Sequence, residues 1–165
     1  MIAVRAEIPA DRDAIRSVNS GAFGRTAEAD LVDRLRADGD LLLSLVAGIG
    51  RAIVGHCAFS RLTVHNHADA IPAVALGPVA VLPERQRRGV GQSMIRDGID
   101  RLRQGGETLV FVLGDPGYYQ RFGFDAGVAA AYRTPYDGPH MQVLRLSDDA
   151  PHRGEVRYAP AFAGL

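Results

Sequence analysis

Apolar residues along this chain fall in short segments that either alternate with polar residues or run uninterrupted, which is the pattern of strands buried on one or both faces. Seven strands are predicted, at residues 2–7, 42–49, 51–64, 74–82, 108–113, 141–146 and 156–158. Gly50 joins the second strand to the third, so these two are expected to form a hairpin. Residues 65–69 are expected to form a polar loop, and Phe124 is expected to begin a strand or a turn.

Four other segments space their apolar residues as helices do, at residues 9–23, 26–38, 89–103 and 116–121. In the first, Asp11 is the expected cap, and Ile15, Val18 and Phe23 are expected on the buried side. In the third, the expected buried face consists of Val90, Met94, Ile95, Ile99 and Leu102. The order β-α-α-β-β-β-α-β-α-β-β follows.

Residues 74–113 form a strand, a crossover helix and a strand, a unit whose two strands should be parallel and whose connection should be right-handed. The preceding hairpin supplies antiparallel strands. We therefore predict an α/β fold with a central mixed β-sheet and helices on both faces. No internal repeat or long linker divides the chain, so residues 1–165 are predicted to form one domain.

The composition narrows the possible functions. Nineteen basic residues balance nineteen acidic ones, and a nucleic-acid binder would normally show a basic excess. All nineteen basic residues are arginine, which excludes a lysine nucleophile, a Schiff base and a Walker-type phosphate loop. Cys57 is the single cysteine, so neither an intramolecular disulfide nor a cysteine metal cluster can form.

No apolar run approaches the roughly 18 residues that a membrane span needs, and the N-terminus is too short and too charged for a signal peptide. We expect a cytoplasmic enzyme or binding protein, with neither a membrane nor a nucleic acid as its partner.

The segment Gln86-Arg87-Arg88-Gly89-Val90-Gly91 lies between a predicted strand and the start of a predicted helix. Free backbone N–H groups and the helix dipole favour an anion at such a position. Glycines allow close approach to a pyrophosphate, and the arginines add positive charge. The alternative is a basic surface turn. A dinucleotide fingerprint would need a glycine where Met94 stands.

Two motifs in order carry a family resemblance. Gln86-x-x-Gly89-x-Gly91 follows the strand at residues 77–83, and residues 110–124 close with Tyr119-x-x-x-Gly123-Phe124. Together they resemble the acetyl-CoA signature and the next strand and helix of the GCN5-related N-acetyltransferases (GNAT superfamily). The resemblance covers most of the chain and is closest to the YhbS-like branch of predicted N-acetyltransferases.

The resemblance implies acetyl-CoA as co-substrate, no metal, and an amine acceptor that attacks the thioester directly in a ternary complex. It implies that pantetheine pairs with the backbone of Val79, Ala80 and Val81. It implies that the pyrophosphate is cradled by Gln86, Arg87, Arg88, Gly89, Val90, Gly91 and Gln92. A catalytically silent acyl-CoA-binding module of the same fold is the alternative function.

Tyr119 aligns with the family tyrosine that protonates the departing thiolate, and a phenol remains protonated at neutral pH. The alternative is that Tyr118 and Tyr119 form a core aromatic pair; in either case one ring is expected to face inward and the other the cleft.

The general base stays open. Many members of the family have a glutamate on the strand before the phosphate loop, but residues 74–82 contain none. Glu84 is expected to be a solvated loop residue. His56 titrates in the useful range, yet a lone strand histidine is more often structural. A water relay is equally compatible.

His65 and His67 are expected to be solvated rather than metal ligands. Cys57 and His56 should point to opposite faces of their strand. The resemblance also implies that residues 10–38 and 65–72 set acceptor specificity. The strands at 141–146 and 156–158 could either complete the sheet or pair across a homodimer, which we expect because members of the family often associate through this region.

Overall fold

A computed structural model describes residues 1–163 of the chain. Its strands are β1 (Ile2–Ala6), β2 (Leu41–Ile49), β3 (Ala52–Asn66), β4 (Asp69–Val81), β5 (Leu109–Leu113), β6 (Tyr132–Arg133), β7 (Met141–Arg145) and β8 (Gly154–Arg157). Its helices are α1 (Arg12–Phe23), α2 (Ala27–Ala37), α3 (Val90–Gln104), α4 (Pro116–Tyr119) and α5 (Ala126–Ala129). Short 3₁₀ turns lie at Pro9–Asp11, Pro83–Arg85, Gln120–Phe122 and Pro160–Phe162.

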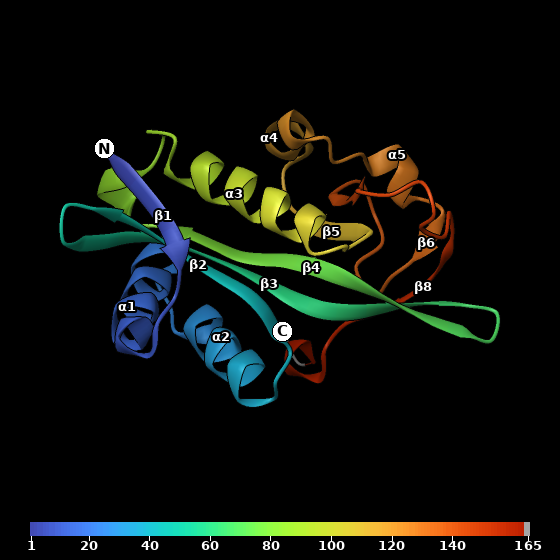
Figure 1. Cartoon of the computed structure of the whole chain (residues 1–165), viewed down its shortest axis with the longest axis horizontal. Coiled ribbons are helices and arrows are strands. Elements are labelled where there is room, and N and C mark those ends of the chain that lie inside the picture. The colour runs from blue at the N-terminus through green and yellow to red at the C-terminus, as the bar shows by residue number, and fades with distance from the viewer. Residues whose placement is uncertain (164–165) are drawn as a thin grey trace.

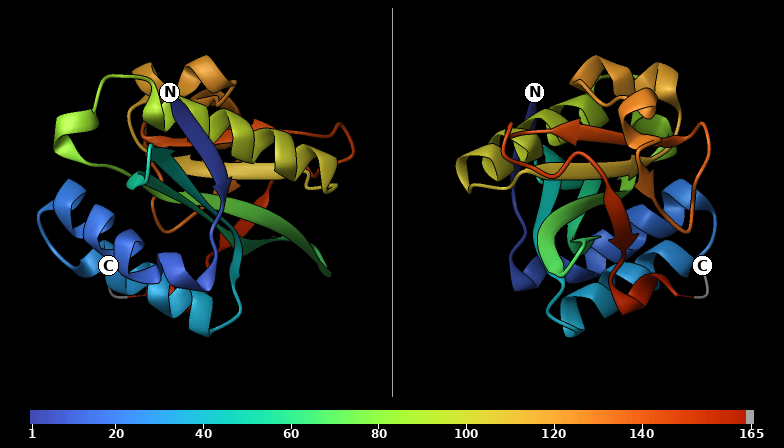
Figure 2. Two further views of the ribbon diagram at one scale, coloured as in Figure 1. Left: turned by 60° about the vertical axis from the view of Figure 1, so that its left-hand side comes forward. Right: turned by 90° about the vertical axis from the view of Figure 1, so that its right-hand side faces the viewer.

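The strands form one mixed sheet in the order β1-β2-β3-β4-β5-β7. Strands β4 and β5 are parallel, and the other neighbours along this path are antiparallel. Helices α1 and α2 cover one face and α3 covers the other (Figures 1 and 2). The predicted α/β architecture, with a mixed sheet between helices, is confirmed. No helix within residues 1–163 has both the length and the apolar character needed to cross a membrane.

The expected polar loop at residues 65–69 is wrong. Strand β3 continues through Asn66, β4 begins at Asp69, and a tight turn with His67 at φ 56° connects them. The polar residues join the strand because their backbone finds partners on both sides: His65 is opposite Ala70 of β4 and opposite Glu155 of β8. Pairing between distant segments therefore overrides the local turn composition.

Two expectations for the first helix also need correction. Asp11 makes no side-chain cap of α1; its carboxylate accepts hydrogen bonds from the Ile8 N–H at 2.8 Å and from Arg5 at 2.7 and 3.0 Å. Ile15 and Val18 are buried as predicted, but Phe23 is 39% exposed. Phe23 is the last residue of α1, and the chain leaves the helix directly after it at Gly24, which adopts φ 68°.

The C-terminal strands complete the sheet within one chain. Strand β7 pairs with β5. Strand β8 pairs with the part of β3 that extends beyond β2, and the short strand β6 pairs with β8. The homodimer expected from these strands stays a prediction.

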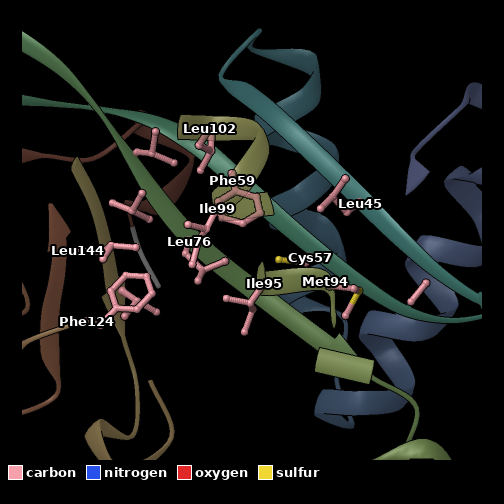
Figure 3. Close-up of a cluster of buried hydrophobic side chains, with 14 of the residues drawn as sticks. Leu45, Cys57, Phe59, Leu76, Met94, Ile95, Ile99, Leu102, Phe124 and Leu144 are labelled. Atoms are coloured by element: carbon pink, nitrogen blue, oxygen red, sulfur yellow. The ribbon is translucent and has the colours of Figure 1, made fainter. Parts of the chain in front are cut away.

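The larger hydrophobic core lies between α3 and the sheet (Figure 3). The predicted buried face of α3 is confirmed for all five residues. Gly98 allows the closest approach, because a Cβ there would lie 2.3 Å from the ring of Phe59. This packing anchors α3, so that its N-terminus is held at the end of β4.

A buried polar cluster ties α1 to the opposite face of the sheet. The fully buried His56 ring lies between Asn19 of α1, whose Nδ2 is 3.0 Å from Nδ1, and Ser44 of β2, whose Oγ is 2.8 Å from Nε2. Because the Asn19 amide donates to Nδ1, the imidazole proton is on Nε2 and is donated to Ser44. Burial lowers the pKa of His56 to about 4. His56 is therefore a neutral structural residue, as the pattern of a lone strand histidine suggested.

The His56 cluster predicts a specific acid sensitivity. The folded-state pKa lies below the unfolded value of 6.5, so the unfolded chain binds the proton first. The contribution of neutral His56 to the free energy of unfolding is fully present above pH 6.5. It should be lost as the pH drops toward 4, by about 3 kcal/mol in total. Urea unfolding at several pH values should show this loss in the wild type and a weaker pH dependence in His56→Gln. The exposed His152→Gln should follow the wild type. Parallel pH profiles for the wild type and His56→Gln would show that His56 is not the group responsible.

Candidate functional site

The site begins where β4 and β5 separate. Their parallel pairing covers Val74–Leu76 and Val110–Val112, and β4 then continues to Val81 without β5 beside it. A bulge lies at this point, because Cys57 is opposite Val79 while Phe59 is opposite Leu76, so that two β4 residues face one on β3. One of the two is Gly77, at φ 140°, a conformation that other residues rarely adopt.

The bulge leaves one edge of β4 facing the cleft. The Leu82 N–H donates to the Val54 carbonyl of β3 at 2.9 Å, so by the alternation of an antiparallel ladder Ala80 also turns its N–H and C=O toward β3. Val79 and Val81 turn theirs the other way. The Val81 carbonyl accepts a hydrogen bond from Gln86 Nε2 at 3.0 Å, which ties the strand to the loop that follows.

That loop ends in a helix N-terminus with free donors. Helix α3 has Gly89 as its N-cap, at φ 84°, and no side chain caps it. The first helical hydrogen bond runs from the Ser93 N–H to the Gly89 carbonyl at 3.0 Å. The N–H groups of Val90, Gly91 and Gln92 therefore have no helical acceptor and point out of the helix end, together with the positive end of its dipole.

A cavity of about 510 Å³ lies over these donors. Its charged lining residues are Arg85, Arg87 and Arg121, and no acidic residue of the described chain lines it. Strand β4 contributes Val79 and Val81. The predicted loop residues that line it are Gln86, Arg87, Gly89, Val90, Gly91 and Gln92.

Two predicted binding residues, Ala80 and Arg88, are not among those lining this cavity. Ala80 is buried and Arg88 is exposed. Sequence reasoning missed Arg85 and Arg121. Arg121 lies inside the second motif, two residues after Tyr119, and its guanidinium is 4.6 Å from the centre of the Tyr118 ring. The position of Arg121 within that motif is a sequence signal from which it could have been predicted.

Both tyrosines of α4 line this cavity, so the expectation that one ring faces inward is wrong. The rings are perpendicular, with centres 5.0 Å apart. The Tyr118 hydroxyl reaches the first turn of α3, because a Cβ on Gly91 would lie 3.0 Å from it. The Tyr119 ring lies over Gly114, where a Cβ would come within 2.5 Å. Both rings line the cavity and also pack against the core under α3, so each combines the two environments that were expected to be divided between them.

Tyr119 also lines a second cavity, of about 470 Å³, on the other side of the opened strands. Val79 is the other residue common to both cavities. Burial raises the pKa of Tyr119 well above that of a free phenol, so its hydroxyl keeps its proton at neutral pH. A protonated phenol thus lies where the two cavities meet, and it can donate a hydrogen bond or a proton there.

The second cavity is mostly apolar. Its walls come from the α1–α2 region, from β4 and β5, and from the loops that carry Tyr136 and Tyr158. Glu28 is the one charged side chain among the described residues that line it. Sequence analysis did not single out Glu28, because one carboxylate in the first turn of a helix is common at the protein surface. Residues of the 10–38 region do line this cavity, whereas residues 65–72 line neither cavity.

The other candidate residues lie elsewhere. Glu84 is exposed and His56 is buried, and neither lines the two cavities. Cys57 packs in the α3 core while His56 contacts α1, so the two face opposite sides of β3, and burial raises the pKa of the thiol. His65 Nε2 is 3.0 Å from the Thr63 hydroxyl. Within the described residues, no group of three or more His, Cys, Asp or Glu side chains is placed to hold a metal ion.

Comparison with known proteins identifies the family to which the chain belongs. The family model described as acetyltransferase (GNAT) domain matches residues 4–127. The chain therefore belongs to the GNAT acetyltransferases, and the resemblance inferred from its two motifs is confirmed.

Within this family, the chain is similar to an uncharacterized N-acetyltransferase of Escherichia coli strain K12, YhbS, with 36% identity over 150 residues and 89% of each chain covered. A second Escherichia coli relative, YjhQ, is 43% identical over 132 residues, which cover 76% of this chain and 73% of the relative. These matches confirm the YhbS-like branch.

Two solved structures share the fold closely. The crystal structure of Escherichia coli YhbS in complex with CoA superposes with a TM-score of 0.89 at 34% identity, covering 98% of this chain and 91% of that one. A GNAT family acetyltransferase from Brucella melitensis in complex with acetyl-CoA gives a TM-score of 0.84 at 38% identity, with 98% of each chain covered.

Proposed function

We propose that this protein transfers the acetyl group of acetyl-CoA to a primary amine, which attacks the thioester directly while both substrates are bound. One observation carries the proposal: a cavity built for an anion and a second, apolar cavity meet at Val79 and Tyr119. A silent acyl-CoA-binding module would have no use for the second cavity. The solved relative from Brucella melitensis, which contains acetyl-CoA, supports the choice of co-substrate.

In this proposal the pyrophosphate of acetyl-CoA binds at the N-terminus of α3. The outward N–H groups of Val90, Gly91 and Gln92 donate to its oxygens, and Arg85, Arg87 and Arg121 supply the opposite charge. The pantetheine arm then extends along β4 toward the bulge. There it pairs with the cleft-facing backbone groups of Val79 and Val81 as an added strand would.

The chemistry follows from what lies at the junction of the cavities. The amine nitrogen attacks the thioester carbon, a C–N bond forms, and negative charge develops on the carbonyl oxygen. A backbone N–H near Val79 stabilises this oxyanion, because it is fixed in place before the reaction begins. The tetrahedral intermediate then collapses, the C–S bond breaks, and Tyr119 donates its proton to the departing thiolate.

The amine must lose a proton during the attack. The one carboxylate of β4, Asp69, is at the start of the strand and lines neither cavity. His56 is buried away from both cavities, and Glu84 is exposed outside them. We therefore assign this proton to a relay of water molecules that leads from the second cavity to solvent.

The pyrophosphate assignment is tested by Gly89→Glu. The new carboxylate enters the anion site and opposes binding, so we expect the affinity for acetyl-CoA to fall at least about tenfold, because charged hydrogen bonds contribute about 1.5–3 kcal/mol each. Isothermal titration calorimetry measures the effect. Gly89→Ala is the matched control, because it introduces the same strain at φ 84° without the charge. Equal affinity in the folded Glu and Ala variants would remove this assignment.

The role of Tyr119 is tested by Tyr119→Phe, which keeps the ring and removes the donor. We expect kcat to fall by about 100-fold, at the lower end for general acid catalysis because a thiolate is already a fair leaving group. The Kd of acetyl-CoA should barely change. Steady-state thiol release gives kcat, and calorimetry gives Kd.

Tyr118→Phe is the informative partner variant, because the Tyr118 hydroxyl reaches Gly91 of the phosphate loop. It should weaken acetyl-CoA binding and leave kcat close to the wild-type value. The opposite pattern, with Tyr118→Phe losing kcat and Tyr119→Phe active, would reverse the two assignments. Wild-type kcat in both variants would assign protonation of the thiolate to water.

A further inference from the structure

The second cavity carries chemical information about the acceptor. Large apolar side chains are rarely left exposed in groups without a binding role. Phe23 is 39% exposed and Leu113 is 50% exposed, and both line this cavity, although they come from α1 and β5. Two separate elements therefore leave apolar surface uncovered at the same place.

The inner wall of the cavity is aromatic. Tyr158 is perpendicular to Tyr136 with ring centres 5.1 Å apart, and it also packs edgewise on Phe162 at 5.3 Å. All three rings line the cavity. Rings held in this way offer flat apolar surface whose conformation is already set, so a planar or branched apolar group can bind without ordering them first.

Glu28 adds the one charge among the described lining residues. Its side chain is 15% exposed and belongs to the first turn of α2. Arg25 Nε lies 3.0 Å from Oε1, and Arg25 Nη2 lies 2.5 Å from Oε2. Arg25 itself is 68% exposed and does not line the cavity, so it fixes the carboxylate from the solvent side.

The hydrogen bonds from Arg25 lower the pKa of Glu28, so the carboxylate is ionised at neutral pH. A carboxylate whose pKa is lowered is a weak base, which favours an electrostatic role over proton abstraction. Arg25 offsets part of this charge from outside the cavity, but Glu28 alone of the pair lines it. On the cavity side the carboxylate therefore attracts an ammonium group and repels a second carboxylate.

The size of the cavity favours a small acceptor. About 470 Å³ is within the range of roughly 300–1,000 Å³ that is typical of small-molecule sites. Taking the proposed acetyl transfer as given, we infer that the acceptor is a small primary amine with an aromatic or branched aliphatic body and no carboxylate, and that Glu28 selects for its positive charge.

Paired acceptors that differ only in a carboxylate test this inference. The pairs are 2-phenylethylamine with L-phenylalanine, and 3-methylbutylamine with L-leucine. Spermidine and an unblocked pentapeptide represent polycations and polypeptide N-termini. Thiol release from acetyl-CoA is followed for each, and calorimetry measures acetyl-CoA binding separately. We expect kcat/KM for each apolar amine to exceed that of its amino acid by about tenfold or more, which is the scale of one charged interaction.

The Glu28→Gln variant shows whether Glu28 causes this preference. Each acceptor has the same intrinsic basicity with the wild type and with the variant, so a changed preference comes from the protein. We expect the KM for 2-phenylethylamine to rise about tenfold with little change in kcat, and the preference over L-phenylalanine to fall by a similar factor. Asp30→Asn is the matched control, because it removes a 64% exposed carboxylate from the same helix outside the cavity. It should behave as the wild type.

The outcomes separate this inference from the proposed function. Preference for spermidine, the pentapeptide or the amino acids leaves acetyl transfer standing and overturns the inferred acceptor class. Equal behaviour of Glu28→Gln and Asp30→Asn overturns the role of Glu28. Acetyl-CoA binding without turnover of any of these acceptors counts against the proposed function and the inference together.

Discussion

The end of pairing between β4 and β5 is the constraint on which the rest of the site depends. Two parallel strands that separate at Leu76 and Val112 leave one strand edge without a neighbour. The bulge that begins at Gly77 turns β4 away from β5 while β3 keeps its pairing on the other side. Backbone groups that would be costly to bury unpaired therefore face a cleft, where a strand-like ligand can satisfy them.

The two sides of this opening differ in chemistry because different elements build them. On one side, the packing of α3 against the sheet holds a helix N-terminus at the end of β4, and arginines surround it. On the other side, α2, β5 and the C-terminal aromatic residues enclose an apolar cavity to which residues 1–163 contribute one carboxylate. Tyr119 lies between them, and burial keeps its hydroxyl protonated. The shape of the sheet thus separates the proposed anion site from the proposed acceptor cavity, and the two share only Val79 and Tyr119 among the described lining residues.

The face of the sheet opposite α3 positions helix α1. There His56, Asn19 and Ser44 form a buried hydrogen-bonded cluster that fixes α1 on the strands. Since α1 is followed directly by α2, the cluster also sets where Phe23 and Glu28 lie relative to β4. A residue whose chemistry suggests a general base therefore contributes through position rather than through proton transfer.

The sequence by itself determined the order of the longer elements and the parallel strand pair, because each rests on spacings within a few residues or within one strand-helix-strand unit. The short elements α5 and β6 were not predicted, because so few residues carry no periodic signal. The phosphate loop and Tyr119 follow from two local motifs that resemble those of the family, and their roles stay predictions. Only the tertiary structure decided which residues share the second cavity, that Tyr118 reaches Gly91, and that His65 and Asn66 belong to a strand. Glu28 and Tyr158 are 130 positions apart in the chain and line the same cavity. No local pattern encodes such a meeting, because it arises from the packing of segments whose separation in sequence carries no periodic signal.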